Sequence, residues 1–186
     1  MVVRHGETEW SAARRHTGRS DPPLSPVGRR QAEQLVDVLK GLVVDRVFCS
    51  PLSRARETCE LAGFGSRATL CEDLREWDYG DYEGLTLEQI RASDPDWNLW
   101  RGGCPGGESP AQVSARADRA LEALTAPGTN LVLVFAHGHL LRVLAARWAG
   151  LEAAHGARFL LATAAIGVLG HDRLTRAVER WNTTEP

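Results

Sequence analysis

Lysine is almost absent from this chain of 186 residues: Lys40 is the only lysine among 22 basic residues, and the others are arginine. The basic residues are balanced by 24 acidic ones, which gives a formal net charge of -2. Nucleic-acid-binding domains usually carry a clear positive excess, so this balance argues against a nucleic-acid partner. Arginine binds phosphate through two parallel N–H donors, which makes some of these arginines candidates for phosphate contacts.

Long apolar runs are missing as well. The longest cover residues 131–136 and 159–170, and both are shorter than the roughly 20 residues that cross a bilayer. The first ten residues contain no apolar segment typical of an export signal, and Arg4 introduces charge early. We therefore expect a cytoplasmic protein with no membrane partner.

Cysteine is scarce, and no pair shows the CxxC spacing of a zinc site. The four cysteines are Cys49, Cys59, Cys71 and Cys104. Free thiols in a reducing compartment are the expectation. His137 and His139 have the spacing of a metal-binding pair, but the sequence offers no third ligand. We expect no metal and no cofactor.

The chain does contain a regular alternation of short apolar runs and helical patterns. The expected strands cover residues 2–3, 46–49, 70–74, 131–136, 159–161, 166–169 and 178–181. Helices are expected to begin at Pro26, Thr86 and Ser109 and to cover 53–62 and 138–149, whereas 7–24, 76–84 and 95–108 are expected to be irregular. This pattern predicts one α/β domain over residues 1–186, with a mostly parallel sheet as the middle of three layers.

Two histidines directly follow predicted strands. His5 follows the first strand, and His137 follows the buried strand at 131–136. Because the carboxyl ends of parallel strands meet at one edge of a sheet, both histidines should lie near the same edge. His16, His155 and His171 have no such context and are expected to be solvated.

The segment Arg4–Trp10, RHGETEW, resembles the RHGE(S/T) signature of the histidine phosphatase superfamily, also called the phosphoglycerate mutase-like family. Other blocks that resemble the family follow in the family's order. They are Gly18–Gly28 (GxxDxPLTxxG), Ser50–Thr58 (SPLxRAxxT), Leu74–Gly84 (LxE…G…EG) and His137-Gly138. The resemblance covers roughly residues 1–150 and implies the three-layer fold of the phosphoglycerate mutase-like proteins.

The resemblance also implies the roles of five residues. His5 would be the nucleophile that forms a phosphohistidine, Glu76 the proton donor, and Arg4, Arg54 and His137 the phosphate pocket. The chemistry of these side chains agrees, because a neutral imidazole attacks phosphorus and a carboxyl group protonates a leaving alkoxide. Without the family motif, the acid could equally be one of the neighbouring carboxylates Asp73, Asp78, Asp81 and Glu83.

One position departs from the family pattern. The family usually has asparagine after the tryptophan of the first motif, and this chain has Ser11, whose hydroxyl is also a donor. Further substrate contacts are expected from Thr17, Gly18 and Gly138. Arg101, in the glycine-rich loop 101–107, is a candidate for a second phosphate group of the substrate. The alternative for Arg101 is a surface arginine beside a packed tryptophan.

Mutases of this family carry an insertion between the glutamate block and the second HG, and here that interval is short. The glutamate block is similar to those of phosphatase branches that include sedoheptulose-bisphosphatases and acid phosphatases. The resemblance therefore implies a metal-independent phosphomonoesterase for small phosphorylated metabolites such as sugar phosphates. The alternative is a 2,3-bisphosphoglycerate-dependent phosphoglycerate mutase. For the apolar run 159–170, an edge-to-edge homodimer and a buried sheet strand are equally good explanations.

Overall fold

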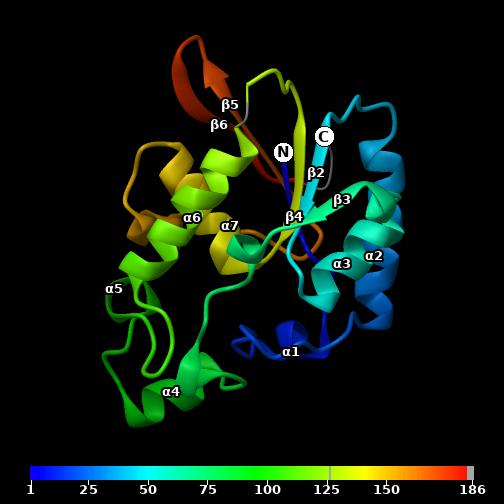
Figure 1. Ribbon diagram of the computed structural model, residues 1–186. Helices are drawn as coiled ribbons and strands as arrows, with labels where there is room; N and C mark the ends of the chain where they lie inside the picture. Colours follow the sequence, from blue (N-terminus) through cyan, green and yellow to red (C-terminus); the bar gives the residue numbers. More distant parts are fainter. Residues whose placement is uncertain (126, 184–186) are drawn as a thin grey trace.

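The computed structural model describes residues 1–125 and 127–183, and in this part of the chain six strands form one mixed sheet (Figure 1). The strands are β1 (Val2–Arg4), β2 (Arg46–Cys49), β3 (Ala68–Leu70), β4 (Val132–Ala136), β5 (Ile166–Asp172) and β6 (Thr175–Thr183). Their order across the sheet is β3-β2-β4-β1-β5-β6. The first four are parallel, and β5 and β6 form an antiparallel hairpin beside β1. The expected α/β fold with a mostly parallel sheet is confirmed.

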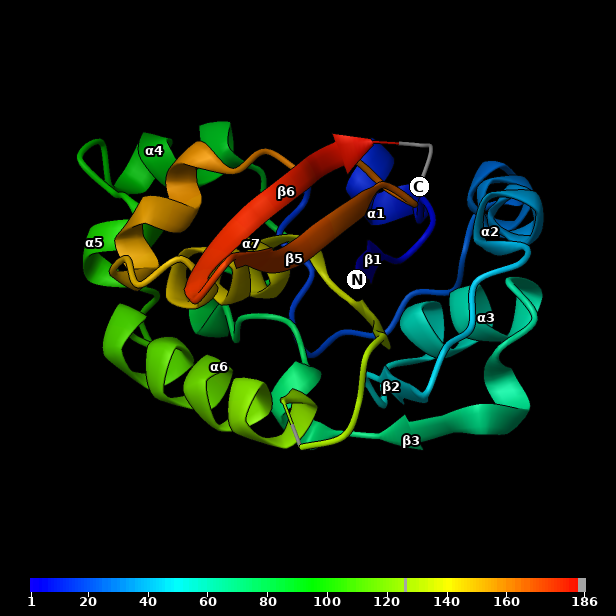
Figure 2. The same cartoon turned by 90° about the horizontal axis from the view of Figure 1, so that it is seen from above.

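Helices cover both faces of this sheet (Figure 2). On one face lie α2 (Pro26–Leu39) and α3 (Ser53–Leu61), and on the other lie α6 (Pro110–Leu124) and α7 (Gly138–Trp148). The shorter helices are α1 (Glu9–Ala12), α4 (Leu87–Ser93) and α5 (Leu99–Gly102), with 3-10 turns at Gly65–Arg67, Glu72–Leu74, Gly80–Tyr82 and Ala153–Arg158. None of the helices described here is both long and apolar enough to span a membrane.

Strand β4 shows why its sequence is continuously apolar. Val134 and Ala136 belong to the core on the α6 and α7 side, whereas Leu133 and Phe135 belong to the core on the α2 and α3 side. Successive side chains of a strand point to opposite faces. Because helices cover both faces, every position from Leu133 to Ala136 is buried.

Local hydrogen bonds set where α2, α4 and α6 begin, as the sequence predicts. The Ser25 side chain accepts from the Gly28 N–H and is followed by Pro26 at the first helical position. Thr86 and Ser109 form capping boxes with glutamines three residues later. These bonds satisfy N–H groups that have no partner within the helix.

Three expectations about secondary structure are wrong. Residues 159–161 are not a strand, because the carbonyls of Leu160 and Leu161 accept hydrogen bonds from the side chains of Trp181 and Arg4. The strand expected at 70–74 ends at Leu70. Two loops expected to be irregular contain the short helices α1 and α5. Short apolar runs do not distinguish a strand from a packed loop.

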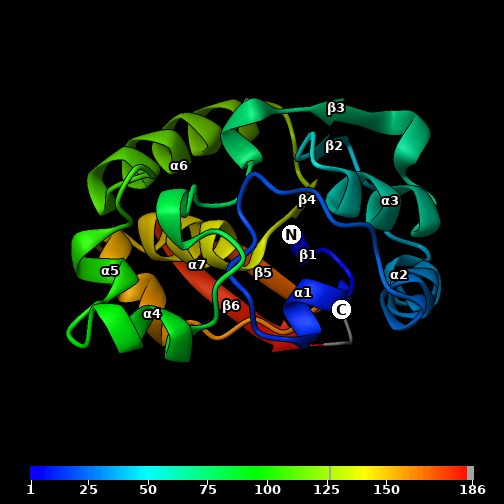
Figure 3. The same cartoon turned by 90° about the horizontal axis from the view of Figure 1, so that it is seen from below.

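The sheet edge at the carboxyl ends of β1 and β4 carries the residues that the sequence singled out. His5 follows β1 and donates its backbone N–H to the carbonyl of Ala136, at the end of β4, at 2.9 Å. Figure 3 looks onto this edge, across which α1 and the segment around α4 lie.

Glycines allow the loop after β1 to pack directly on the start of α2. A Cβ atom on Gly28 would lie 2.0 Å from the carbonyl oxygen of Glu7, and one on Gly6 would lie 2.3 Å from that of Gly28. Both obstacles are backbone atoms, which cannot swing away as a flexible side chain can. The loop is therefore positioned by contact between two stretches of backbone.

We expect Gly28→Ala to lower the free energy of unfolding by about 1–3 kcal/mol, because the added methyl group forces the loop away from α2. Denaturant unfolding followed by circular dichroism measures this change. The matched control is Gly102→Ala, where a Cβ atom meets nothing within 4 Å and alanine suits a helix better than glycine. Equal stability of the two variants would contradict the close approach.

Candidate active site

His5 is held in one orientation at the end of β1. Its side chain is 4 % exposed, and its Nδ1 lies 2.7 Å from the carbonyl oxygen of Gly6. A carbonyl only accepts, so Nδ1 carries the hydrogen and donates it, which leaves the lone pair on Nε2. Burial lowers the pKa of His5 well below its usual value, and the positive charges of Arg54 and Arg4 lower it further. The ring is therefore neutral in neutral solution and keeps a free lone pair on Nε2.

Three buried donors beside His5 have no hydrogen-bond partner in the described residues: Nε of Arg4, Nε of Arg54 and Nδ1 of His137. A buried donor without a partner costs free energy. All three belong to the residues expected to form a phosphate pocket. This donor set fits an anion with several acceptor oxygens, as a phosphoryl group has.

The Arg54 guanidinium is completely buried on α3. Its Nη1 donates to the carbonyl of Ser20 at 2.9 Å, and its Nη2 donates to the carbonyls of Thr17 and Gly18 at 3.0 and 3.1 Å. Asp21 supplies a longer ion pair at 3.4 Å. These bonds use the outer nitrogens and leave Nε for the anion.

His137 lies at the N-cap position of α7, and its ring centroid is 5.2 Å from that of His5. Burial lowers the pKa of His137 well below its usual value, and Arg54 and His5 add to the effect. Its Nε2 lies 2.7 Å from the Ser50 hydroxyl. When that hydroxyl donates its proton to Nε2, the neutral ring carries its hydrogen on Nδ1 and can donate it to a phosphoryl oxygen.

Glu76 is fixed against the first turn of α7. Its Oε1 accepts from the backbone N–H groups of Trp77 and Leu140 at 2.9 and 2.8 Å, and its Oε2 accepts from that of His139 at 2.9 Å. The amino end of a helix attracts negative charge. The carboxylate is 7 % exposed, and it lines the same cavity as His5.

The structure also separates Glu76 from the other acids of its block. Asp73 is paired with Arg119 and Asp78 with Arg19, both on the surface. Glu83 accepts from the backbone N–H groups of Gly18 and Ser20, and Asp81 is exposed outside the cavity lining. Glu76 is thus the acid of this block placed beside the histidine, as the family motif implied.

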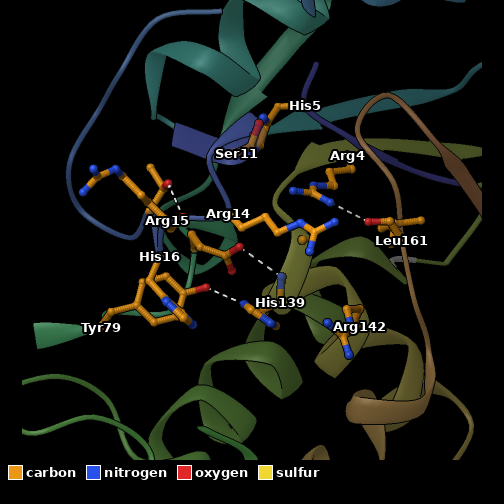
Figure 4. Close-up of a pocket in the computed structure, with 13 residues that line it drawn as sticks. Arg4, His5, Ser11, Arg14, Arg15, His16, Tyr79, His139, Arg142 and Leu161 are labelled. Atoms are coloured by element: carbon orange, nitrogen blue, oxygen red, sulfur yellow. Dashed lines mark hydrogen bonds between the residues drawn. The ribbon is translucent and has the colours of Figure 1, made fainter. Parts of the chain in front are cut away.

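A cavity of about 290 Å³ opens beside these groups (Figure 4). Its lining consists of Arg4, His5, Ser11, Arg14, Arg15, His16, Thr17, Glu76, Tyr79, Gly138, His139, Arg142 and Leu161. Gly138 lies so close to Arg4 that a Cβ atom there would be 3.2 Å from the guanidinium carbon. Among the residues described, no group of three or more His, Cys, Asp or Glu side chains is arranged to hold a metal ion.

Of the other expected substrate contacts, some line the cavity and others do not. Ser11 and Thr17 line the cavity. The Ser11 hydroxyl, however, donates to the carbonyl of Thr8 and belongs to the capping box of α1. The backbone N–H of Gly18 donates to Glu83, so it is already engaged. Arg101 is exposed on α5 and is not part of the cavity lining.

Six lining residues were not identified from the sequence: Arg14, Arg15, His16, Tyr79, Arg142 and Leu161. His16, expected to be solvated, packs its ring against Tyr79 and Trp97 and bonds the carbonyl of Leu85. Tyr79 bonds His139 Nδ1 at 2.5 Å. The only signal in the sequence was for Arg142, which follows His139 by three positions on one helix and so shares its face.

Fold and site together describe an enzyme of the phosphohydrolase type, with a buried histidine and an arginine-rich anion pocket at the end of parallel strands. Comparison with known proteins specifies the family. The model of the histidine phosphatase superfamily (branch 1) matches residues 1–184, and the chain belongs to this family.

Relatives of this chain include phosphatases. An acid phosphatase of Mycobacterium tuberculosis is 46% identical over 179 residues, which is 95% of this chain and 88% of that protein. A sedoheptulose 1,7-bisphosphatase of Saccharomyces cerevisiae is 37% identical in an alignment of 182 positions that covers 81% of this chain and 67% of that protein. A solved structure from an open reading frame of Mycobacterium tuberculosis superimposes with a TM-score of 0.92 at 43% identity, covering 97% of this chain and 95% of that one.

We expect the His5 ring to remain neutral at pH 6.5 and to take up a proton only well below it, because burial and two arginines lower its pKa. Titration by NMR, with the His5 signal assigned through His5→Ala, measures this. The same protein in denaturant, where histidines titrate near 6.5, is the control. Protonation of His5 in the folded protein at or above pH 6.5 would contradict the assignment.

Proposed function

We propose that this protein is a metal-independent phosphomonoesterase that hydrolyses small phosphorylated metabolites, such as sugar phosphates, through a phosphohistidine on His5. The observation that carries this proposal is the neutral His5 ring beside three buried nitrogen atoms, on Arg4, Arg54 and His137, that have no hydrogen-bond partner in the described part of the chain. A nucleophile and a preformed anion pocket are the two requirements for transfer of a phosphoryl group to the enzyme.

In the first step, Nε2 of His5 attacks the phosphorus atom and forms an N–P bond, while the bond from phosphorus to the ester oxygen breaks. Arg4, Arg54 and His137 donate to the phosphoryl oxygens and stabilise the negative charge that they carry in the transition state. Glu76 in its acid form gives a proton to the leaving alkoxide, which departs as an alcohol.

In the second step, a water molecule attacks the phosphohistidine. The Glu76 carboxylate left by the first step takes a proton from this water, so the acid form is regenerated. The N–P bond breaks, its electron pair returns to Nε2, and phosphate leaves. The hydrogen bond from Nδ1 of His5 to Gly6 keeps the ring oriented during both steps.

The first test is phosphate release from a panel of phosphate esters with a chelator present throughout. We expect release that survives the chelator and is lost in His5→Ala. His171→Ala is the matched control, because His171 is an exposed histidine on β5 outside the cavity lining. Release that persists in His5→Ala would overturn the proposed nucleophile. Conversion of 3- to 2-phosphoglycerate without net phosphate release would favour the mutase.

A second test separates the two roles of Glu76. In Glu76→Gln we expect kcat on alkyl phosphates to fall by about 100-fold or more, the usual scale of acid–base catalysis. With p-nitrophenyl phosphate, whose leaving group needs no proton, we expect a burst of one product per enzyme followed by slow turnover, because the attack of water still lacks its base. Rapid-mixing kinetics show this burst. Equal losses on both ester types without a burst would contradict the assignment.

A further inference from the structure

The cavity carries more positive charge than one phosphoryl group requires. Arg14, Arg15 and Arg142 line it in addition to Arg4, and Glu76 is the only acid among the described lining residues. Arg15 donates to the carbonyl of Gly84 and points partly to solvent. Arg14, which is also exposed, and the partly buried Arg142 likewise form no ion pair among the described residues.

Arg142 is fixed by neutral groups rather than by an acid. Its Nε and Nη2 donate to the carbonyls of Gly156 and Ala157 at 2.9 Å each, and its guanidinium carbon lies 4.6 Å from the centre of the Trp100 ring. No described carboxylate forms an ion pair with it. A guanidinium has five N–H donors, so Nη1 remains available at the cavity while the plane of the group is held in place.

Arg14 occupies an unusual backbone position. Its φ of +56° lies in the left-handed region, directly after the C-cap of α1, where glycine is the usual residue. A non-glycine residue is strained there, so the turn itself does not explain an arginine. Figure 4 shows the side chain extending across the cavity toward Arg4. Its guanidinium has no hydrogen-bond or ion-pair partner among the described residues.

We propose that Arg14 and Arg142 form a second anion-binding subsite, so that the preferred substrate carries a phosphate or carboxylate group in addition to the phosphate that is removed. This inference rests on the proposed phosphatase function and specifies its substrate class. A second anion would balance the like charges of Arg4, Arg14 and Arg142, and forked guanidinium donors suit carboxylate and phosphate oxygens equally. The cavity of about 290 Å³ has the size of a small metabolite site.

The test uses two pairs of substrates that differ by one anionic group. Fructose 1,6-bisphosphate is compared with fructose 6-phosphate, and 3-phosphoglycerate with glycerol 3-phosphate. We expect the wild type to prefer the doubly anionic member of at least one pair, and the preferred pair tells phosphate from carboxylate. In Arg14→Gln and Arg142→Gln, kcat/KM for that member should fall about 10- to 100-fold, mainly through KM, with little change for the other member.

Arg101→Gln is the matched control, because Arg101 is exposed outside the cavity and is the candidate for a second phosphate that the sequence offered. It should change neither member of a pair. Arg14→Gly separates binding from folding: glycine relieves the left-handed strain, so this variant should melt no lower than the wild type and yet lose the preference. Equal losses on both members of each pair, or no preference in the wild type, would overturn the subsite.

Binding measured without turnover keeps the subsite distinct from the proposed reaction. Calorimetric titration of His5→Ala with fructose 1,6-bisphosphate and fructose 6-phosphate, and with the second pair, compares affinities even if no ester is hydrolysed. Tighter binding of a doubly anionic member that Arg142→Gln abolishes would support the subsite whatever the outcome of the activity assay. Equal affinities within both pairs would overturn it, while leaving a phosphatase for simple monoesters intact.

Discussion

The buried guanidinium of Arg54 is the group on which the geometry of the site depends. A positive charge removed from water is costly unless its donors find partners, and here the carbonyls of Thr17, Gly18 and Ser20 accept from its two outer nitrogens. All three carbonyls belong to one loop, so the bonds tie that loop to α3. Asp21 completes the unit by accepting from the backbone N–H of Ser53, the first residue of α3. The loop that contributes Thr17 to the cavity lining and the Arg54 guanidinium are therefore positioned together.

The arginine charges of the site help to keep its histidines neutral. Burial and the arginine charges both lower the pKa of His5 and of His137, so these rings stay neutral beside cationic neighbours. In the proposed reaction a neutral imidazole keeps the lone pair that attacks phosphorus, while the arginines supply fixed donors for the phosphoryl oxygens. Donors already in place need not reorganise when charge shifts in the transition state, which is the main advantage of such a site.

Helix α7 carries much of the remaining machinery. His137 is its N-cap, and Gly138 allows close approach to Arg4. The backbone N–H groups of His139 and Leu140 hold Glu76, and the side chains of His139 and, about one turn further on, Arg142 line the cavity. Residues on one packed helix keep their distances to one another. Much of the site thus follows from docking one rigid element against the end of β1.

The sequence by itself determined the features that depend on neighbours along the chain. The caps at Ser25, Thr86 and Ser109 form hydrogen bonds with residues three positions away. The continuous apolar run of β4 predicts that both of its faces are covered. His5 and His137 could be placed at one edge because each directly follows a strand. Glu76 could be selected among five acids only through its family motif, since neighbouring carboxylates look alike in sequence.

Tertiary structure decided which arginines meet in the cavity and which segments pair. Arg14 and Arg142 are far apart in the chain, yet both line the cavity. Arg101, the candidate that the sequence offered, lies on the surface of α5. Residues 159–161 have a strand-like composition, yet their carbonyls bond side chains of Arg4 and Trp181 instead of a neighbouring strand. Such contacts join residues far apart in the chain, so the free energy that selects them exists only once the sheet and its helices have assembled.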